Sequence, residues 1–161
     1  GDMQNKGDIG EIVIKGENVM HGYNNNPEAN TEAFVDGWFR TGDQGFLGEA
    51  GYLTLTGRIK ELINRAGEKI SPLEIDGVLL KHPAVAEAVC FAVPDEKYGE
   101  VVHAAVVLKG DADAESIRTF CREQMADFKV PDLIYITDSL PRTATGKIQR
   151  RHMVAAFASG D

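Results

Sequence analysis

The sequence predicts a mixed α+β fold, in which a short, mainly β segment precedes a small domain with one sheet and flanking helices. Alternating, β-branched runs recur along the chain, whereas helical patterns are few, short and concentrated in its second part. The composition also changes at 57–61, where a charged pentad follows a hairpin pattern. These observations divide the 161 residues into a segment 1–57 and a domain 58–161.

Composition restricts the class of protein. Hydrophobic residues make up 43% and charged residues 26% of the chain, as in globular proteins that bury a core. The formal net charge of −8 argues against nucleic acid as the main partner, because phosphates repel an acidic surface. Cys90 and Cys121 lie in apolar patterns typical of reduced core residues, and the histidines lack the spacing of a metal site. We expect a cytoplasmic protein without a membrane span, since neither an export signal nor a long apolar run is recognisable.

The segment 1–57 is expected to be mainly β. Pro27 starts a short helix, and glycines at both ends of 48–51 indicate a hairpin turn. Thr41-Gly42-Asp43 is expected to be a tight connection between strands. So few elements are too little to close a core by themselves. The expected elements are strands at 9–15, 38–40, 45–47 and 52–56, and a helix at 27–34.

The domain 58–161 is expected to contain a three-stranded sheet with two or three helices. Ser71-Pro72 is a helix start, and His82-Pro83 is a helix stop. The strand 101–108 is apolar at nearly every residue, which predicts a central position with both faces covered. The sheet strands are expected at 85–93, 101–108 and 133–136, after an alternating run at 62–65, and the helices at 72–82, 113–125 and 148–157.

A basic loop late in the sequence is the first candidate site. Pro141 and Gly146 bracket small residues, and Lys147 follows the glycine. Four positive charges and no acid lie between residues 140 and 152. Lys147 is either a solvated loop charge or a group that binds an anion. The loop is not the phosphate loop of nucleotide hydrolases, because Pro141 replaces its first glycine and Ile148 its hydroxyl residue.

Three further positions suit nucleotide chemistry. Asp43 can accept hydrogen bonds from both hydroxyls of a ribose, or it can close a turn on its own backbone. Arg58 can donate to ribose or phosphate oxygens, but with Lys60 it also fits a pair of linker surface charges. Gly67, in the turn 66–70, lets backbone approach a thin ligand or closes a simple hairpin. The residue patterns alone leave these alternatives open.

Four motifs, in order and spacing, resemble the last motifs of the AMP-forming acyl-CoA synthetase family. That family includes the adenylation domains of peptide synthetases and firefly-type luciferases. The resemblance covers essentially the whole chain, and 57–75 is most similar to small-acid ligases of the oxalate–CoA ligase type. The motifs are Trp38–Asp43, Gly57–Ile63, Gly67–Ile75 and Pro141–Ile148.

The resemblance implies that the chain is a fragment. In the family a large domain carries a phosphate loop and the acyl pocket, and neither is found in this sequence. Residues 1–57 would be the C-terminal end of that large domain and 58–161 the mobile C-terminal domain, with a hinge near 58–61. We therefore expect an acid–thiol ligase in the full-length protein, and an inactive fragment that holds no nucleotide or cofactor tightly.

The resemblance also implies roles for individual residues. In the family, a carboxylic acid reacts with Mg-ATP to give an acyl-adenylate and pyrophosphate, and CoA then displaces AMP. Lys147 would be the catalytic residue of the first step, without a protein-bound metal. Asp43 and Arg58 would bind the nucleotide, and Lys60 would be the hinge. The CoA channel would be lined by Ala66, Gly67, Glu68, Lys69, Tyr98 and Phe128.

The sequence departs from the family pattern at two positions, and two other functions are compatible with it. Val130 and Asp132 stand where certain relatives have basic residues, which puts the contacts to the CoA phosphates in doubt. The alternatives are an adenylation domain that loads a carrier protein and a binding module without catalysis. Expected partners are the missing large domain, ATP, a carboxylic acid, CoA, and a lysine acetyltransferase or deacetylase acting on Lys147, whose charge acetylation would remove.

Overall fold

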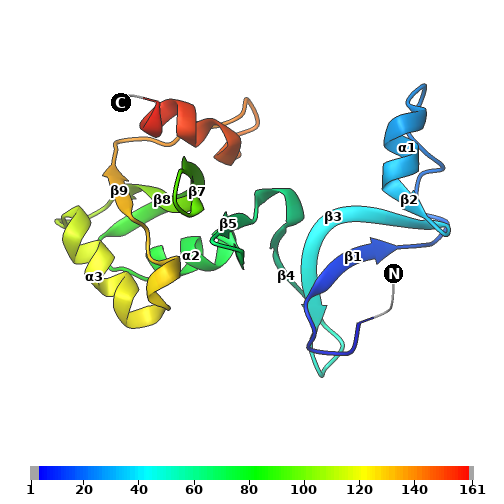
Figure 1. Cartoon of the computed structure of the whole chain (residues 1–161), viewed down its shortest axis with the longest axis horizontal. Helices are drawn as coiled ribbons and strands as arrows, with labels where there is room; N and C mark the ends of the chain where they lie inside the picture. The colour runs from blue at the N-terminus through cyan, green and yellow to red at the C-terminus, as the bar shows by residue number, and fades with distance from the viewer. Residues whose placement is uncertain (1–3, 160–161) are drawn as a thin grey trace. The chain divides into compact units, whose positions relative to one another are not determined.

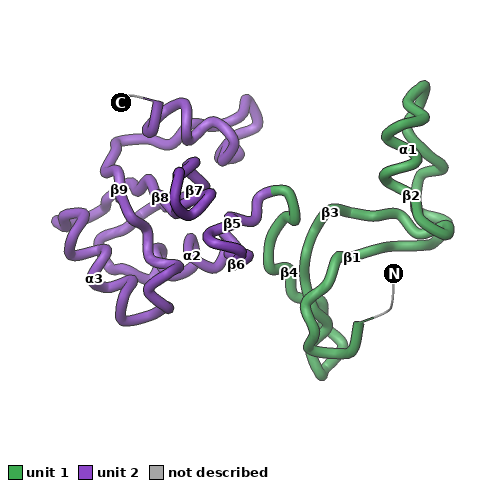
Figure 2. The backbone as a smooth tube through the Cα atoms, in the orientation of Figure 1, with its two compact units in different colours: residues 1–60 green, residues 61–161 purple. Residues whose placement is uncertain are grey.

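The computed structural model describes residues 4–159 and divides into two compact units (Figures 1 and 2). The division falls between Lys60 and Glu61, inside the charged pentad. The predicted mixed α+β fold class is confirmed. The helices of the described part are too short or too polar to cross a lipid bilayer.

Unit 1 is a four-stranded antiparallel sheet with one short helix. Its elements are β1 (Gly10–Ile14), α1 (Pro27–Ala33), β2 (Phe34–Val35), β3 (Trp38–Leu47) and β4 (Leu53–Arg58). The long strand β3 pairs with each of the other three strands. The predicted helix start is confirmed, since the Asn26 side chain accepts a hydrogen bond from the Ala29 N–H (3.1 Å) and Pro27 takes the first helical position.

The expected connection at Thr41-Gly42-Asp43 is wrong, because these residues lie inside β3. Gly42 has a φ of 70°, so the strand accommodates a local irregularity instead of ending there. The predicted hairpin around 48–51 is confirmed, with the Gly48 N–H donating to the Tyr52 carbonyl oxygen (2.9 Å). The strand after it also runs further than expected, through Arg58.

Unit 2 contains a five-stranded sheet, two α-helices and short helical turns. The 3₁₀ turn η1 (Ile59–Glu61) spans the boundary between the units. The elements of unit 2 that follow it are β5 (Ile63–Arg65), β6 (Glu68–Ile70), α2 (Pro72–Leu79), β7 (Val85–Asp95), β8 (Gly99–Leu108), α3 (Ala114–Gln124), η2 (Asp127–Lys129), β9 (Leu133–Ile136), η3 (Arg150–His152) and η4 (Val154–Ala158). The central position predicted for β8 is confirmed: it pairs with β7 and β5 antiparallel and with β9 in parallel. The predicted three-stranded sheet is wrong, because the β5–β6 hairpin joins β8 through the pair Arg65 and Gly99.

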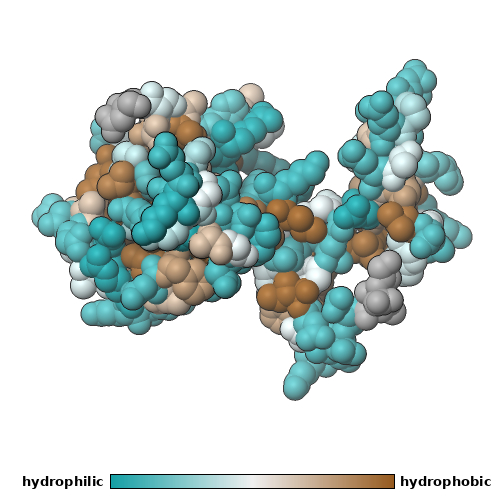
Figure 3. Space-filling model, viewed as in Figure 1, coloured by the Kyte–Doolittle hydropathy of each residue, from teal (hydrophilic) through white to brown (hydrophobic). Residues whose placement is uncertain are grey.

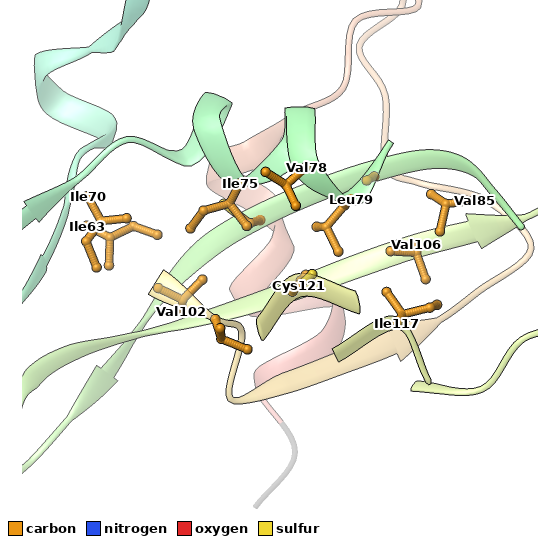
Figure 4. Packing of buried hydrophobic residues seen from close by; sticks show 14 residues of the cluster. Ile63, Ile70, Ile75, Val78, Leu79, Val85, Val102, Val106, Ile117 and Cys121 are labelled. Carbon is orange, nitrogen blue, oxygen red and sulfur yellow. The ribbon is translucent and has the colours of Figure 1, made fainter. Parts of the chain in front are cut away.

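The sheet of unit 2 is covered on both faces. On one face, apolar residues of α2 and α3 pack against alternate residues of β7 and β8, and Figure 4 shows Ile75 and Leu79 of α2 with Val102 and Val106 of β8. On the other face, residues of the C-terminal segment, among them Met153, pack against the intervening strand residues. This two-sided burial explains the continuous apolar run of β8.

The expected helix at 148–157 is wrong in its start and its type. The Gln149 N–H donates to the Pro141 carbonyl oxygen (2.9 Å), and Ile148 forms a bridge with Arg142, so this backbone cannot begin a helix. Helical structure begins at Arg150 as a 3₁₀ turn and continues as a π turn. Tertiary pairing of the loop therefore overrides the helical pattern.

The two units expose apolar surface to different degrees. In the space-filling view both show hydrophobic areas between polar ones (Figure 3). Within the described residues, every fully buried hydrophobic side chain belongs to unit 2. The β3–β4 hairpin of unit 1 instead exposes Leu47, Tyr52, Leu53 and Leu55.

Candidate functional site

Asp43 and Arg58 lie directly opposite each other on neighbouring strands of unit 1. The Arg58 Nε atom is 3.0 Å from an Asp43 carboxylate oxygen, and the two side chains remain 62% and 30% exposed, respectively. The hydroxyl of Thr41 accepts a hydrogen bond from the Asp43 N–H (3.0 Å). The pair offers acceptors and donors on one surface, a combination that suits the hydroxyl groups of a ribose.

Lys147 closes a tight loop on the surface of unit 2. The Thr143 N–H donates to the Lys147 carbonyl oxygen (2.8 Å), and the Gly146 N–H donates to the Thr143 carbonyl oxygen (2.9 Å). Arg142 donates to the Gly146 carbonyl oxygen (2.8 Å) and forms an ion pair with Glu87 of β7. The loop backbone is therefore held in place, whereas the Lys147 side chain is exposed. In the described part of the chain its ammonium has no ion-pair partner.

Arg150 anchors the segment that follows this loop. Its guanidinium lies 2.7 Å from the Asp76 carboxylate of α2 and 3.1 Å from the Glu61 carboxylate beside the unit boundary. It also donates to the carbonyl oxygen of Cys90, whose N–H donates to Asp76 (2.6 Å). Burial disfavours the charged guanidinium, but pairing with Asp76 outweighs this effect, so the pKa of Arg150 is raised. Through Arg150, the chain just after Lys147 is fixed to residues near the boundary.

The turn between β5 and β6 is the second candidate region of unit 2. Arg65 pairs with Glu68, which leaves Ala66 and Gly67 as a two-residue loop. Their φ angles are 52° and 93°, and such positive values at both central positions are typical of a tight hairpin turn. The Ala66 N–H donates to the Tyr98 carbonyl oxygen (2.8 Å), which fixes the turn beside β8. A Cβ at Gly67 would meet open space, so the turn presents accessible backbone.

Arg65 connects this turn to two other candidate residues. Its guanidinium carbon lies 5.1 Å from the centre of the Tyr98 ring. Its Nη1 atom donates to the Phe128 carbonyl oxygen (3.3 Å) and to the Asp132 carboxylate (3.3 Å). The structure thus brings together Tyr98, Phe128 and the Ala66 turn, although they lie far apart in the sequence.

Glu68 and Lys69 of the predicted CoA channel adjoin the same turn, whereas the predicted hinge Lys60 lies before β5. Glu68 and Lys69 follow the turn on β6, with exposed side chains. The Lys97 ammonium lies 4.8 Å from the centre of the Tyr98 ring. Lys60, the predicted hinge, is exposed in the 3₁₀ turn η1 between β4 and β5.

The Lys147 loop and the Ala66 turn are attached to opposite ends of the β7–β8 hairpin. The loop is tied to β7 at Glu87, whereas the turn is tied to Tyr98, next to the pair Asp95 and Gly99. Glu87 and Asp95 are 95 − 87 = 8 residues apart on this strand. At about 3.3 Å per residue, their backbones are about 26 Å apart. The points at which the two regions attach to this strand are therefore well separated.

Burial shifts the pKa values of three titratable side chains in the core of unit 2. Burial lowers the pKa of His103 below its ordinary value of 6.5, and the nearby carboxylate of Asp132 only partly opposes this effect. Burial raises the pKa of the Cys90 thiol well above its ordinary value, with a contribution from the carboxylate of Asp76. Burial also raises the pKa of Cys121 to about 11, so both thiols are poor nucleophiles near neutral pH. No cluster of metal-ligating side chains is found between residues 4 and 159.

Comparison with known proteins identifies the class of protein that this chain resembles. Residues 74–147 match the family model of the AMP-binding enzyme C-terminal domain. A probable CoA ligase of Humulus lupulus and an oxalate–CoA ligase of Arabidopsis thaliana are 57% and 54% identical to the chain over 159 residues. The alignments cover 98% of this chain and only 30% and 31% of those relatives.

Solved structures agree with the sequence matches. The o-succinylbenzoate CoA synthetase of Bacillus subtilis in complex with ATP and magnesium ion has a TM-score of 0.85 and 40% identity. The match covers 94% of this chain and 31% of that structure. The same synthetase is also known in complex with an acyl-adenylate intermediate. The fold is therefore that of adenylate-forming ligases. Within them, the chain is similar over nearly its whole length to AMP-forming CoA ligases, and residues 74–147 match the C-terminal domain of AMP-binding enzymes, so the predicted resemblance is confirmed.

Sequence reasoning missed two residues that organise these regions. In the sequence, Arg65 lies in an alternating strand pattern and Arg150 among the charges of the basic loop, and neither pattern predicts a site residue. Their partners lie 63 to 74 positions away in the sequence, at Phe128 for Arg65 and at Asp76 for Arg150. The local signal is weak, because each arginine lies beside other polar or charged residues and only its distant partners distinguish it from a surface charge.

Proposed function

We propose that the full-length protein containing this chain is an acid–thiol ligase that makes an acyl-adenylate from Mg-ATP and then an acyl-CoA. The similarity to CoA ligases supports this activity. The observation that carries the proposal is that the Lys147 loop, through Arg142, and the Ala66 turn are attached to different ends of the β7–β8 hairpin. Two half-reactions that need different ends of the same domain require that domain to turn between them.

In adenylate formation, Lys147 acts on the reacting anions. A carboxylate and the α-phosphate of ATP repel each other, and the ammonium of Lys147 offsets this repulsion and the charge that grows at phosphorus. The exposed side chain on a fixed loop backbone suits this role, since the charge reaches outward from a rigid base. Asp43 accepts hydrogen bonds from the ribose hydroxyls. Arg58 keeps the Asp43 carboxylate oriented and donates to the same nucleotide.

In thioester formation, unit 2 turns about Lys60 and presents the Ala66 turn. The segment 1–57 is then the end of the large domain, and 58–161 is the mobile domain. The accessible backbone at Gly67 lets the narrow pantetheine arm pass, while Glu68 and Lys69 line the path beside it. Tyr98 and Phe128 offer ring faces to the nucleotide end of CoA. The thiol attacks the acyl carbon, and AMP leaves with the bonding electron pair.

The substrate and setting are also proposals. Identity of 54% to an oxalate–CoA ligase supports a small dicarboxylic acid such as oxalate as the acid. The buried, free thiols of Cys90 and Cys121 support a reducing, cytoplasmic environment. Exposure of Lys147 in a loop of small residues makes it accessible to a lysine acetyltransferase and deacetylase, which would switch adenylate formation off and on. The isolated chain, without the missing large domain, is inactive and holds no nucleotide tightly.

The test is to measure both half-reactions in the full-length enzyme carrying Lys147→Ala. Adenylate formation, followed by ATP–pyrophosphate exchange with oxalate, should fall about 10²–10⁴-fold, because a preorganised charge is removed. Thioester formation from supplied acyl-adenylate should change much less. Arg151→Ala, which removes an exposed charge four residues later, is the matched control. Equal losses in the two steps would contradict this division of labour, and acylation of a carrier protein but not CoA would reassign the acceptor.

A further inference from the structure

We propose that Arg65 is a positioning residue for the CoA end of the site and fixes the Ala66 turn, Tyr98 and the 128–132 segment as one surface. This inference rests on the proposed function, because it concerns the thiol substrate of the same reaction. Arg65 is neither exposed enough nor free enough to act as a simple phosphate-binding cation. Its side chain is 15% exposed, and its guanidinium already has three partners.

The three partners of Arg65 belong to separate parts of unit 2. The Tyr98 ring precedes β8, the Phe128 carbonyl oxygen lies in η2, and the Asp132 carboxylate precedes β9. A planar guanidinium can stack on a ring and donate in its plane at the same time, whereas an ammonium cannot combine these contacts in a fixed geometry. Arg65 therefore sets the spacing between two aromatic residues that come from different segments.

The backbone around Arg65 shows why the turn needs such a brace. Ala66 holds a left-handed φ of 52° although it carries a Cβ. This conformation is unfavourable for a residue with a Cβ and persists only where the surroundings impose it. The surroundings do so through the bond from the Ala66 N–H to the Tyr98 carbonyl oxygen and through the bond from the Asn64 N–H to the Glu100 carboxylate (2.6 Å). Arg65 lies between these two bonds, so its stacking on Tyr98 completes the support of the turn.

Arg65 also changes the charge of the surface. Asp132 places a carboxylate in the segment next to Tyr98 and Phe128, where an anionic ligand would be repelled. The Arg65 guanidinium, at 3.3 Å, neutralises this carboxylate. The ammonium of Lys97 beside the Tyr98 ring then remains to attract phosphate groups. Certain relatives have basic residues at the positions of Val130 and Asp132. In this chain, Arg65 of β5 supplies the positive charge that those positions lack.

The experiment uses the full-length enzyme with Arg65→Lys and Arg65→Met, and Arg122→Met as a control that removes an exposed arginine also paired with a carboxylate. Adenylate formation by ATP–pyrophosphate exchange and the KM for CoA, 3′-dephospho-CoA and pantetheine are measured. We expect a rise in KM for CoA of about tenfold in both Arg65 variants, because displacement of a positioned group by about 1 Å weakens productive binding strongly. Pantetheine, which does not reach the aromatic surface, should change little, and adenylate formation should stay within about twofold.

A double variant, Arg65→Met with Asp132→Asn, separates positioning from charge. If Arg65 positions the surface, removal of the carboxylate does not restore the KM for CoA. Full restoration would overturn the positioning role and leave only charge neutralisation. Equal losses in both half-reactions together with a lowered melting temperature would show a purely structural role, and an unchanged KM in both single variants would also reject the inference. Absence of adenylate in the unmodified enzyme would instead overturn the proposed function. The same variants would then be compared by calorimetric titration with CoA. Weaker binding in the Arg65 variants supports the role of Arg65, and unchanged binding rejects it.

Discussion

Unit 1 and unit 2 are both built around an antiparallel sheet, but only unit 2 buries the sheet under other layers. In unit 2, helices cover one face and the C-terminal segment covers the other, so residues such as Ile75, Leu79 and Val106 are fully buried. In unit 1, Leu55 and Tyr52 remain 60% and 78% exposed within the described structure. Alternation of apolar residues makes a strand, but a second layer is needed to make a core. We infer that unit 1 depends on another surface, which in the proposed enzyme is the large domain.

The largest expected effect follows from cutting the chain between the units. Residues 61–161 should unfold cooperatively when expressed alone, because they contain the whole buried core, whereas 1–60 should show no cooperative transition. Thermal unfolding followed by circular dichroism measures both. In the intact chain, limited proteolysis should cut first near 58–61 or within 16–31. Cooperative unfolding of 1–60 alone, or an unfolded 61–161, would contradict the inferred difference in core formation between the units.

Truncating one leucine in each unit compares the same chemical change in the two settings. Leu79→Ala removes a side chain with 0% exposure and should lower the free energy of unfolding of unit 2 by about 2–5 kcal/mol. Leu55→Ala, at 60% exposure, should cost less than about 0.5 kcal/mol in this chain. Urea titration of both variants gives the values. Similar losses would show that Leu55 is covered in solution.

The ion pairs allow the same comparison for charges. Arg150–Asp76 and Arg58–Asp43 have similar distances of 2.7 and 3.0 Å, but their side chains are 15% and 13% exposed in the first pair and 62% and 30% in the second. Arg150→Met should cost about 3 kcal/mol of unfolding free energy, because it leaves the Asp76 carboxylate buried without its partner. Arg58→Met should cost less than about 1 kcal/mol. Equal costs in urea titrations would contradict the difference in burial.

The smallest effect is a pH dependence specific to unit 2. Because burial lowers the pKa of His103, its neutral form is favoured in the folded state, and the unfolded state binds more protons below its ordinary value of 6.5. Stability should therefore fall as the pH decreases below about 6.5 and stop falling from this cause below the folded-state pKa, with a slope of at most about 1.4 kcal/mol per pH unit. Melting temperatures between pH 7.5 and 5 should show a shallower fall in His103→Gln. An identical pH profile in both proteins would exclude His103 as the cause.

Elements that depend on local signals can be predicted from the sequence alone. Turn residues, the proline that starts α1 and the apolar run of β8 predicted most helices and strands, because each signal depends on neighbours a few positions away. The motifs around Asp43 and Lys147 were also recognisable in the sequence, since a family motif is itself a local pattern. Local information failed at Gly42, because a glycine there is compatible both with a turn between strands and with an irregularity inside one strand. In the structure, β3 continues through this position.

Contacts between residues far apart in the sequence became visible only in the folded chain. The pairing of Arg65 with Gly99 turned an expected three-stranded sheet into one of five strands, and the bond from Gln149 to Pro141 displaced the start of the last helical turns. Arg65 acquired its significance only when the chain brought Phe128, 63 residues later, within hydrogen-bonding distance. Such contacts depend on how the layers close around the core, and no window of neighbouring residues contains that information.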